Sequence, residues 1–249
     1  MGELLYYDEE EEWNHALLMY NAVLKEISTK IEILNSEFQL AHQYNPIEHI
    51  SSRIKSSSSI ARKIRIKGLE LTVENIIRYV NDVAGVRIIC SFTSDIYRIA
   101  SAIAKQDDVT VLQIKDYIAN PKENGYRSYH MIVSIPIFLS NDVINTKVEI
   151  QIRTIAMDFW ASLEHKIYYK FEGKAPSGIK EELQECANII SFLDQKMLSI
   201  NESVKNYHED FNGGTIISPD EDISSLSSDI HITDSIKPLF GEIYSHSKP

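Results

Sequence analysis

Two acidic residues, Asp82 and Glu149, have settings in which a carboxylate could bind a metal or accept a proton. Asp82 directly precedes the apolar run VAGVRIICSF, which predicts a buried strand. Glu149 lies in TKVEIQIRT, where polar and apolar residues alternate. If the two strands are neighbours, the carboxylates can share a Mg²⁺ ion, because magnesium is typically held by one or two carboxylates together with substrate phosphates and water. The alternative is a solvated polar face, and the spacing alone favours that alternative.

The alternation around Glu149 also predicts its companions on the sheet, since successive side chains of a strand point to opposite faces. The apolar face consists of Val148, Ile150 and Ile152. The polar face consists of Lys147, Glu149, Gln151 and Arg153.

A compact basic segment, residues 49–69, lies upstream of both carboxylates and contains no acid. Its six basic residues are Arg53, Lys55, Arg62, Lys63, Arg65 and Lys67. In a chain with a formal net charge of −11, such a cluster favours a small polyanion over a long nucleic acid. We therefore expect no stable nucleic-acid partner. A solvated basic helix face is the alternative.

The serines at 56–59 can cap a helix in this basic segment, and Gly68 can end it. Lys55, Ser59 and Lys63 have the spacing i, i+4, i+8 and can share one face if the helix begins early. Lys63 is then expected near the helix start, where amide groups attract anions. Phosphate is the natural candidate for that anion.

A third chemical feature is the polar loop NPKENGYRSYH, residues 120–130, which contains helix-breaking proline and glycine. Tyr126 follows Gly125, so its ring can project and stack on a nucleotide base. Lys122 can reach a phosphate, and His130 follows at the start of an apolar strand. An ordinary loop with a packing tyrosine is the alternative, and for such a loop taken alone it is the commoner case.

Two long helices flank the segments that carry these residues. Apolar residues spaced four and three apart predict helices over 9–43 and over 179–207. Between them, the patterns predict strands at 83–92, 109–115, 129–138 and 146–154, and helices at 95–105 and 155–171. The expected fold is α+β, with a mixed, mostly antiparallel sheet flanked by helices. The expected parts are an N-terminal helix 1–45, a central α/β domain 46–175, a helix for packing or oligomerisation 176–211, and a mobile tail 212–249.

Composition excludes several classes of protein. The two cysteines, Cys90 and Cys186, match neither a disulfide framework nor a cysteine-rich metal site. The first residues are acidic where a secretory signal is basic, and no apolar run approaches the roughly 18 residues of a membrane span. We expect a cytoplasmic protein without membrane contact. Walker A, GxGxxG and GxSxG motifs are absent from the sequence.

Taken together, four segments resemble a known family. SRIKSSSSIARK, DVAGVRIICSF, KDYIANPKENGYRSYH and VEIQIRTIAMDFWASLEHKIYYK follow one another in the order seen in RelA/SpoT-like alarmone synthetases. The chain most resembles the small, single-domain members of the RelP type, from about residue 13 to residue 197. The resemblance implies a nucleotidyltransferase-like synthetase fold and a homotetramer.

The resemblance also implies an activity. Such enzymes move the β,γ-pyrophosphate of ATP to the ribose 3′-oxygen of GDP or GTP, with Mg²⁺, and form AMP and the stringent-response alarmones ppGpp or pppGpp. The implied ligands of ATP are Arg53, Lys55, Ser59 and Lys63 at its phosphates and Arg87 at adenine. The implied ligands of the guanosine nucleotide are Lys122, Tyr126, His130, Gln151, Asp158 and Glu164, with Tyr126 stacked on guanine. Asp82 would bind the metal, and Glu149 would lie near it and activate the 3′-hydroxyl.

Two other functions stay open at the level of sequence. One is a nucleotidyltransferase that releases pyrophosphate, which would use the same pair of carboxylates. The other is a nucleotide- or RNA-binding regulator without catalysis. The sequence has no HD dipeptide, so we expect no alarmone hydrolysis.

Overall fold

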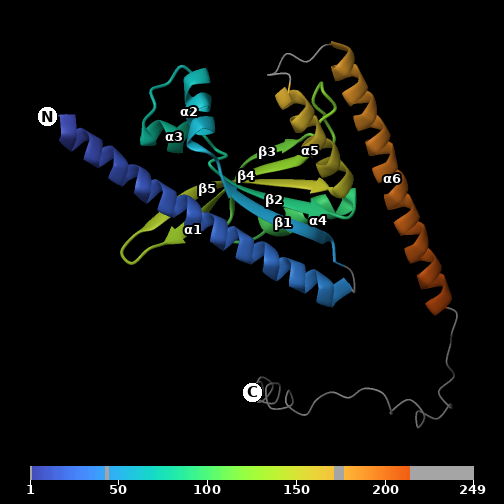
Figure 1. Ribbon diagram of the computed structural model, residues 1–249. Helices are drawn as coiled ribbons and strands as arrows, with labels where there is room; N and C mark the ends of the chain where they lie inside the picture. The colour runs from blue at the N-terminus through green and yellow to red at the C-terminus, as the bar shows by residue number, and fades with distance from the viewer. Residues whose placement is uncertain (1, 43–44, 171–176, 214–249) are drawn as a thin grey trace, which may run out of the picture. The chain divides into compact units, whose positions relative to one another are not determined.

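The computed structural model describes residues 2–42, 45–170 and 177–213. Along that part of the chain the elements are α1 (Gly2–His42), β1 (Ile47–Ile54), α2 (Ser57–Ile66), α3 (Val73–Tyr79), β2 (Ala84–Cys90), α4 (Thr93–Ala104), β3 (Thr110–Asp116), β4 (Tyr129–Phe138), β5 (Val143–Thr154), α5 (Ile155–Lys170) and α6 (Ser177–Gly213) (Figure 1). The chain divides into two units, Met1–Glu202 and Ser203–Pro249. The sheet and the candidate site belong to the first.

The five strands form one sheet in the order β1-β2-β5-β4-β3. Strands β2 and β5 pair in parallel, whereas β1–β2, β4–β5 and β3–β4 pair antiparallel. The prediction of a mixed, mostly antiparallel sheet flanked by helices is therefore confirmed. The parallel pair matters most for function, because it places the strand after Asp82 beside the strand that carries Glu149.

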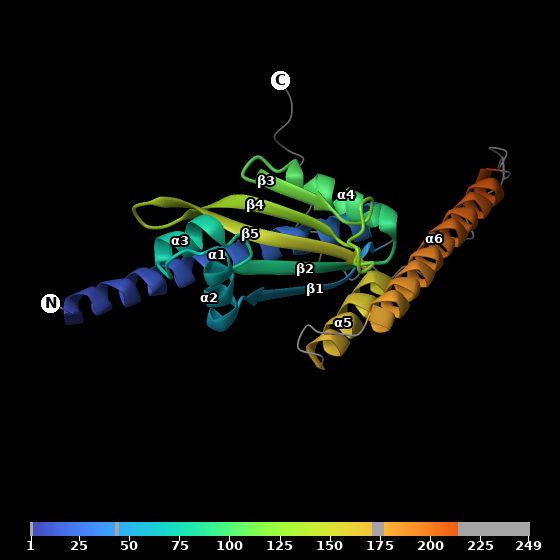
Figure 2. The same ribbon diagram turned by 90° about the horizontal axis from the view of Figure 1, so that it is seen from above.

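Helix α1 covers one face of this sheet and supplies much of the core. It contacts β1, β2, β4 and β5, and Figure 2 shows it running along the strands behind the sheet. Its buried side chains include Val23, Ile27 and Ile31, which are fully buried. Full burial of such an aliphatic side chain contributes about 1.5–3 kcal/mol to folding. The helix predicted over 9–43 and its apolar seam are therefore confirmed as far as His42, and residue 43 lies outside the described residues.

The alternation predicted for β5 is also confirmed. Val148, Ile150 and Ile152 are fully buried and belong to the same hydrophobic core as α1 and α4. The opposite face of β5 carries the polar residues predicted for it. Packing on one face thus fixes the direction in which Glu149 and Gln151 point, because a one-residue slip would bury them under α1.

Two elements were absent from the sequence-based expectation. Strand β1 pairs only with β2 at the edge of the sheet, and most of its side chains are exposed, so it lacks the apolar alternation that marks a half-buried strand. Helix α3 has only seven residues; the Thr72 side chain caps it by accepting a hydrogen bond from the Asn75 amide. Such a short helix depends on tertiary packing, which local periodicity does not reveal.

Helix α2 has the predicted caps but not the predicted position of its lysine. Ser56 is the N-cap, and Gly68 follows the helix with φ of +69°. The expectation that Lys63 lies near the helix start is wrong, because the helix begins at Ser57 and Lys63 belongs to its last turn. A cation there is favoured by the helix dipole. The attraction of an anion to this lysine therefore rests on its side chain, not on the amide groups of the helix N-terminus.

The apolar seam predicted for the last helix is split between two environments. In the first unit, Leu183 and Ile190 pack inward, whereas Leu193, Met197 and Ile200 are exposed. The tail predicted from residue 212 lies, from residue 214 onward, outside the described residues. None of the helices in the described ranges is long and apolar enough to cross a membrane.

Candidate functional site

The parallel pairing of β2 with β5 builds the centre of the candidate site. Gly85 lies opposite Glu149, and Arg87 lies opposite Gln151. Arg87, Glu149 and Gln151 therefore point to the same face of the sheet, away from the core. Asp82 lies three residues before Gly85, at the end of the sheet where this pairing begins. The condition set by the sequence, that the two strands be neighbours, is met.

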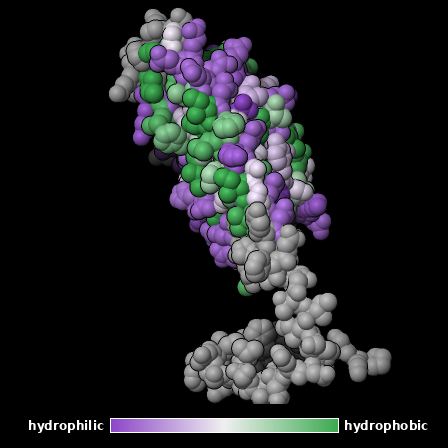
Figure 3. All heavy atoms as spheres, turned by 90° about the vertical axis from the view of Figure 1, so that its right-hand side faces the viewer, coloured by the Kyte–Doolittle hydropathy of each residue, from purple (hydrophilic) through white to green (hydrophobic). Residues whose placement is uncertain are grey.

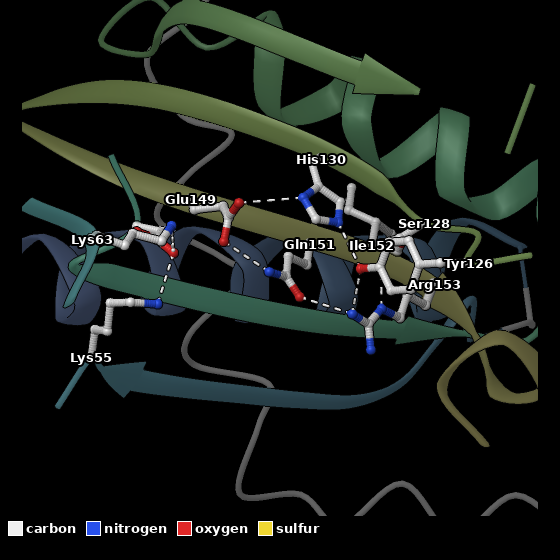
Figure 4. Close-up of polar contacts among 10 residues, drawn as sticks. Lys55, Lys63, Tyr126, Ser128, His130, Glu149, Gln151, Ile152 and Arg153 are labelled. Atoms are coloured by element: carbon white, nitrogen blue, oxygen red, sulfur yellow. Dashed lines mark hydrogen bonds and ion pairs between the residues drawn. The ribbon is translucent and has the colours of Figure 1, made fainter. Parts of the chain in front are cut away.

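Asp82 is bound by two lysines that approach from α2 and from the segment before it. Its Oδ2 atom lies 3.0 Å from Lys55 Nζ and 2.7 Å from Lys63 Nζ (Figure 4). Burial alone would raise the pKa of Asp82, but the hydrogen bonds and positive charges of the two lysines outweigh burial and hold the pKa below its ordinary value. The carboxylate is therefore ionised at neutral pH.

The second oxygen of Asp82, Oδ1, is buried and has no hydrogen-bond partner in the described part of the protein. An uncompensated buried carboxylate oxygen is costly, and a divalent cation would satisfy it. No group of three or more His, Cys, Asp or Glu side chains in the described ranges could hold a metal ion. A cation at this place would therefore be held by Asp82 and Glu149, with the remaining ligands supplied by phosphate and water. That donor set suits Mg²⁺.

The other predicted ligands of ATP phosphates are placed differently. Arg53 lies on β1 and lines a cavity of about 270 Å³ together with Arg87, Asp82 and Glu149. Ser59 does not line this cavity, and its Oγ accepts a hydrogen bond from Ser56 Oγ at 2.9 Å in the cap of α2. The structure therefore brings three of the four predicted phosphate ligands to the carboxylates and leaves Ser59 in the helix cap.

Glu149 is held by two neighbours on the polar face. Its Oε1 lies 3.3 Å from His130 Nδ1, and its Oε2 accepts a hydrogen bond of 2.8 Å from Gln151 Nε2. Burial would raise the pKa of Glu149, and the negative charge of Asp82 also raises it, but His130 and Gln151 favour the charged form and the net shift is downward. Glu149 is therefore an ionised carboxylate with a fixed orientation.

The loop at residues 120–130 folds over the other side of Glu149. The hydroxyl of Tyr126 lies 2.8 Å from His130 Nε2. The Lys122 ammonium lies 4.7 Å from the centre of the Tyr126 ring, a distance typical of a cation–π contact. Asn124 Nδ2 donates to Glu164 Oε1 on α5 at 3.2 Å. The loop is thus tied to both β4 and α5, and the predicted acceptor residues Lys122, Tyr126 and His130 are brought together.

Arg153 connects this loop to the rest of the site. Its side chain is 6% exposed, and its guanidinium donates to four side-chain oxygens. The acceptors are Ser128 Oγ at 3.3 Å, Asp158 Oδ1 at 3.0 Å, Tyr126 Oη at 2.6 Å and Gln151 Oε1 at 3.1 Å. The Tyr126 hydroxyl oxygen accepts a hydrogen bond from Arg153, so its proton is available to donate to His130 Nε2. With Nε2 as the acceptor, the neutral His130 ring carries its proton on Nδ1 and can donate it to Glu149 Oε1.

Two routes therefore lead from Arg153 to Glu149, one through Tyr126 and His130 and one through Gln151, and they close a ring of hydrogen bonds (Figure 4). In a closed ring each side chain limits the orientation of the next. The ring therefore couples the position of the Tyr126 ring to the orientation of the Glu149 carboxylate.

Asp158, near the start of α5, joins the two halves of the site. Its Oδ1 lies 3.0 Å from Arg153 Nη1 and 3.3 Å from Arg87 Nη1. Burial and the nearby positive charge of Arg153 lower the pKa of Arg87, while Asp158 raises it. The guanidinium of Arg87 nevertheless stays charged, since arginine is effectively always protonated in proteins.

Two cavities meet at the carboxylates. One, of about 420 Å³, is lined by Lys63, Lys67 and Lys115, and the second is the cavity of about 270 Å³ that contains Arg53 and Arg87. Asp82 and Glu149 line both. A larger hollow of about 960 Å³ lies between α1, α3 and the first residues of β5 and contains none of the predicted site residues. We place the site at the two smaller cavities, because charged groups from separate elements converge there.

Comparisons with known proteins agree with this arrangement. Residues 52–174 match the model described as the region found in RelA / SpoT proteins. The chain is 50% identical over 194 residues to GTP pyrophosphokinase YwaC of Bacillus subtilis, a match that covers 78% of this chain and 92% of the relative. It is 36% identical over 197 residues to GTP pyrophosphokinase YjbM of the same species, covering 79% and 92%.

The chain belongs to the RelA/SpoT family. Two solved structures from Bacillus subtilis share its fold. Small alarmone synthetase 2 matches with a TM-score of 0.71 and 47% identity over 77% of this chain and 99% of that one. Small alarmone synthetase 1, in a crystal structure described as bound to its product pppGpp, matches with a TM-score of 0.73 and 36% identity over 78% and 99%. The family resemblance and the fold expected from it are confirmed.

Within this RelA/SpoT chain, sequence reasoning assigned no role to Arg153, although it placed the residue on the polar face of β5. The sequence did show that Arg153 points to the same face of β5 as Glu149 and Gln151, because it follows them by four and two residues. A buried arginine on such a face must have partners, because an unpaired buried charge is too costly to keep. Two of those partners, Ser128 and Tyr126, lie 25 and 27 residues away in the sequence, so they are brought to Arg153 only when the chain folds.

Proposed function

We propose that this chain is a GTP pyrophosphokinase that transfers the β,γ-pyrophosphate of ATP to the ribose 3′-oxygen of GDP or GTP, giving ppGpp or pppGpp and AMP. The observation that carries this proposal is the position of Asp82 and Glu149 between a pair of lysines suited to bind phosphates and a loop suited to bind a nucleotide base. Lys55 and Lys63 converge on one side, and the loop with Tyr126 lies on the other. The most similar relatives named above are GTP pyrophosphokinases, which supports the same activity.

On the donor side, Lys55 and Lys63 would bind the ATP phosphates, since both ammonium groups already meet at an anionic oxygen. Arg87 and Arg53 line the smaller cavity, where the planar guanidinium of Arg87 would stack on adenine. Ser59 is a weaker candidate for a phosphate ligand, because its hydroxyl takes part in the cap of α2.

On the acceptor side, Tyr126 would stack on guanine, because its ring is presented by the loop and its hydroxyl is fixed by Arg153 and His130. Lys122 lies beside that ring and would contact the nucleotide phosphates. Gln151, Asp158 and Glu164 are each held by hydrogen bonds on this side of the site and would orient the acceptor.

The reaction joins the ribose 3′-oxygen to the β-phosphorus of ATP and breaks the bond between that phosphorus and the oxygen that bridges it to the α-phosphorus. AMP leaves with the bridging oxygen, and the 3′-hydroxyl proton passes to the Glu149 carboxylate. Glu149 suits this task because it is ionised at neutral pH and fixed by His130 and Gln151. Positioning and positive charge supply most of the acceleration in such transfers.

Asp82 and Glu149 fit a Mg²⁺ ion, as the unpartnered Oδ1 of Asp82 indicates. When bound, the ion supplies positive charge to the phosphate oxygens and to the developing alkoxide. Lys55 and Lys63 hold Asp82 in place through its other oxygen, which leaves Oδ1 available as the proposed metal-binding atom.

The test is an assay with γ-labelled ATP, each of GMP, GDP and GTP as acceptor, and buffers with and without Mg²⁺. We expect label in a guanosine product and stoichiometric AMP in the presence of the metal. Release of pyrophosphate without AMP would instead identify a nucleotidyltransferase. Nucleotide or RNA binding without any turnover would identify a regulator and refute the proposal.

We also propose that the chain assembles into a homotetramer through its terminal helices. In the first unit, α6 carries a band of exposed apolar side chains, visible in green in Figure 3. The band consists of Ile189, Phe192, Leu193, Met197 and Ile200. Burial of such a band is favourable. Mass photometry should show a species of four chains, and a monomer at micromolar concentration would contradict assembly.

The cytoplasmic location stays a prediction.

A further inference from the structure

The first turns of α6 pack directly against the acceptor side of the site. Gly125 has φ of +85°, and a Cβ atom at this position would lie 2.5 Å from the Cβ of Ala187 and 3.5 Å from the Cα of Gln184. Position 125 therefore requires glycine for two reasons: the positive φ of its backbone and the close approach of α6. The Ala187 methyl group and the backbone of Gln184 therefore lie directly against the loop that presents Tyr126.

The same face of α6 makes three further contacts with the acceptor side. Trp160, Ala161 and Ala187 form a small hydrophobic cluster, and the side chain of Tyr126 packs against it. Trp160 Nε1 donates to the Leu183 carbonyl at 2.9 Å. Farther along, Thr154 Oγ1 donates to Asp194 Oδ2 at 2.5 Å.

Thr154 also begins α5, because its Oγ1 accepts the Met157 amide at 3.1 Å. The contacts of α6 thus reach the loop, the middle of α5 and the junction of β5 with α5. These elements carry Tyr126, Asp158 and Glu164. The contact residues Leu183, Ala187, Ile190 and Asp194 are spaced four, three and four apart and lie on one face of the helix, which we call the inner face.

The donor side has no such contact in the described part of the chain. Arg53 lies on β1, Lys55 in the segment after it and Lys63 on α2, and Figure 2 shows α2 and the α5–α6 pair at separate places along the sheet. Of the proposed ATP ligands, Arg87 on β2 pairs with Asp158 of α5. A change in the inner face of α6 should therefore act much more strongly on the acceptor than on ATP.

We propose that the inner face of α6 positions the loop of residues 120–130 for the acceptor nucleotide, with Gly125 and Ala187 as the positioning residues at the closest contact. This inference rests on the proposed function. Because α6 lies behind the loop rather than in the cavities, Ala187 acts through Tyr126 and touches no substrate.

The decisive variant is Ala187→Val, which adds carbon where Gly125 leaves no room. We expect the KM for GDP to rise by about 10- to 100-fold, since small misplacements of binding groups have effects of this size, while the KM for ATP stays within about twofold. Asn188→Val is the matched control: it places the same β-branched side chain on the neighbouring, exposed position of the same helix and should behave as wild type.

A second pair of variants tests the contact itself. Gly125→Ala should raise the KM for GDP, and adding Ala187→Gly should recover part of that loss, because the second change removes the methyl group that the new Cβ meets. A double variant no better than Gly125→Ala would contradict the contact.

Hydrogen exchange of the amides in residues 122–127, measured without nucleotide, gives a readout independent of catalysis. Exchange should be faster in Ala187→Val than in Asn188→Val. Unchanged exchange, an unchanged KM for GDP, or a parallel rise in the KM for ATP would overturn the inference. Should the wild-type protein form no AMP, the proposed function fails, and the exchange experiment still decides whether α6 orders the loop.

Discussion

Replacement of Arg153 by lysine tests whether the ring of hydrogen bonds around Glu149 is needed for turnover of the acceptor nucleotide. The guanidinium donates to Ser128, Asp158, Tyr126 and Gln151, and its side chain is 6% exposed. A lysine keeps the charge but has three donors on one nitrogen, so it cannot span four acceptors that lie around a planar group.

The magnitude follows from the bonds that would be lost. If lysine keeps the contact with Asp158, at least two of the other bonds are lost, and buried acceptors left without partners cost about 1–3 kcal/mol each. We expect a net loss of about 2–3 kcal/mol, which corresponds to roughly a 30- to 160-fold decrease in kcat/KM for the acceptor. Asp158 retains Arg87, so the KM for ATP should change much less.

The assay is AMP formation with GDP varied at saturating ATP and with ATP varied at saturating GDP. Thermal unfolding of each variant confirms that the assay temperature lies well below the transition. Arg98→Lys is the matched control, because Arg98 lies on α4 and pairs with Asp95 at 3.6 Å, outside both cavities. A loss of less than threefold for Arg153→Lys, or an equal loss for both substrates, would refute the reasoning.

Three further predictions concern single side chains. Glu149→Gln should lower kcat by about 10²–10⁴-fold because the proton acceptor is lost, while calorimetry should still detect ATP and GDP binding. Tyr126→Ala should weaken GDP binding by about 1–3 kcal/mol, since stacking is lost, and equal weakening for ATP in the same titrations would argue against this role. Burial raises the pKa of Asp194, so its charge costs stability at neutral pH, and that cost disappears as the pH falls through the raised pKa toward the ordinary value. Asp194→Asn should therefore raise Tm relative to wild type at pH 7 and lose this advantage near pH 4, whereas parallel curves of Tm against pH would contradict the assignment.

Local sequence patterns were sufficient for the elements that carry the site. The alternation of polar and apolar residues in β5 predicted that Glu149 and Gln151 lie on the polar face. Only one register of the strand buries every apolar residue of this pattern in the core. Ser56 and Gly68 marked the ends of α2, because their caps depend only on neighbouring backbone. The order of the motifs was sufficient for the family, which 50% identity to a GTP pyrophosphokinase then confirmed.

The same patterns misplaced or missed features that depend on distant parts of the chain. Lys63 was expected at the start of α2 and lies in its last turn, where its partner is Asp82, 19 residues away. Strand β1 was missed because an exposed edge strand has little apolar alternation. The position of Lys63 within α2 follows from the local caps, whereas its contact with Asp82 and the existence of β1 depend on where β2 lies.

The sequence by itself determined the residue types of the site, the strands and helices that bear most of them, and the polar face on which Glu149 stands. These follow from periodicity and caps, which act over a few residues. Only the tertiary structure decided that β2 pairs in parallel with β5, that Arg153 closes a ring of hydrogen bonds with Glu149, and that Ala187 of α6 packs against Gly125. Each of these three features includes a contact between residues tens of positions apart. Such contacts form only in the folded protein, because the whole chain must bury the core face and satisfy its buried polar groups at once.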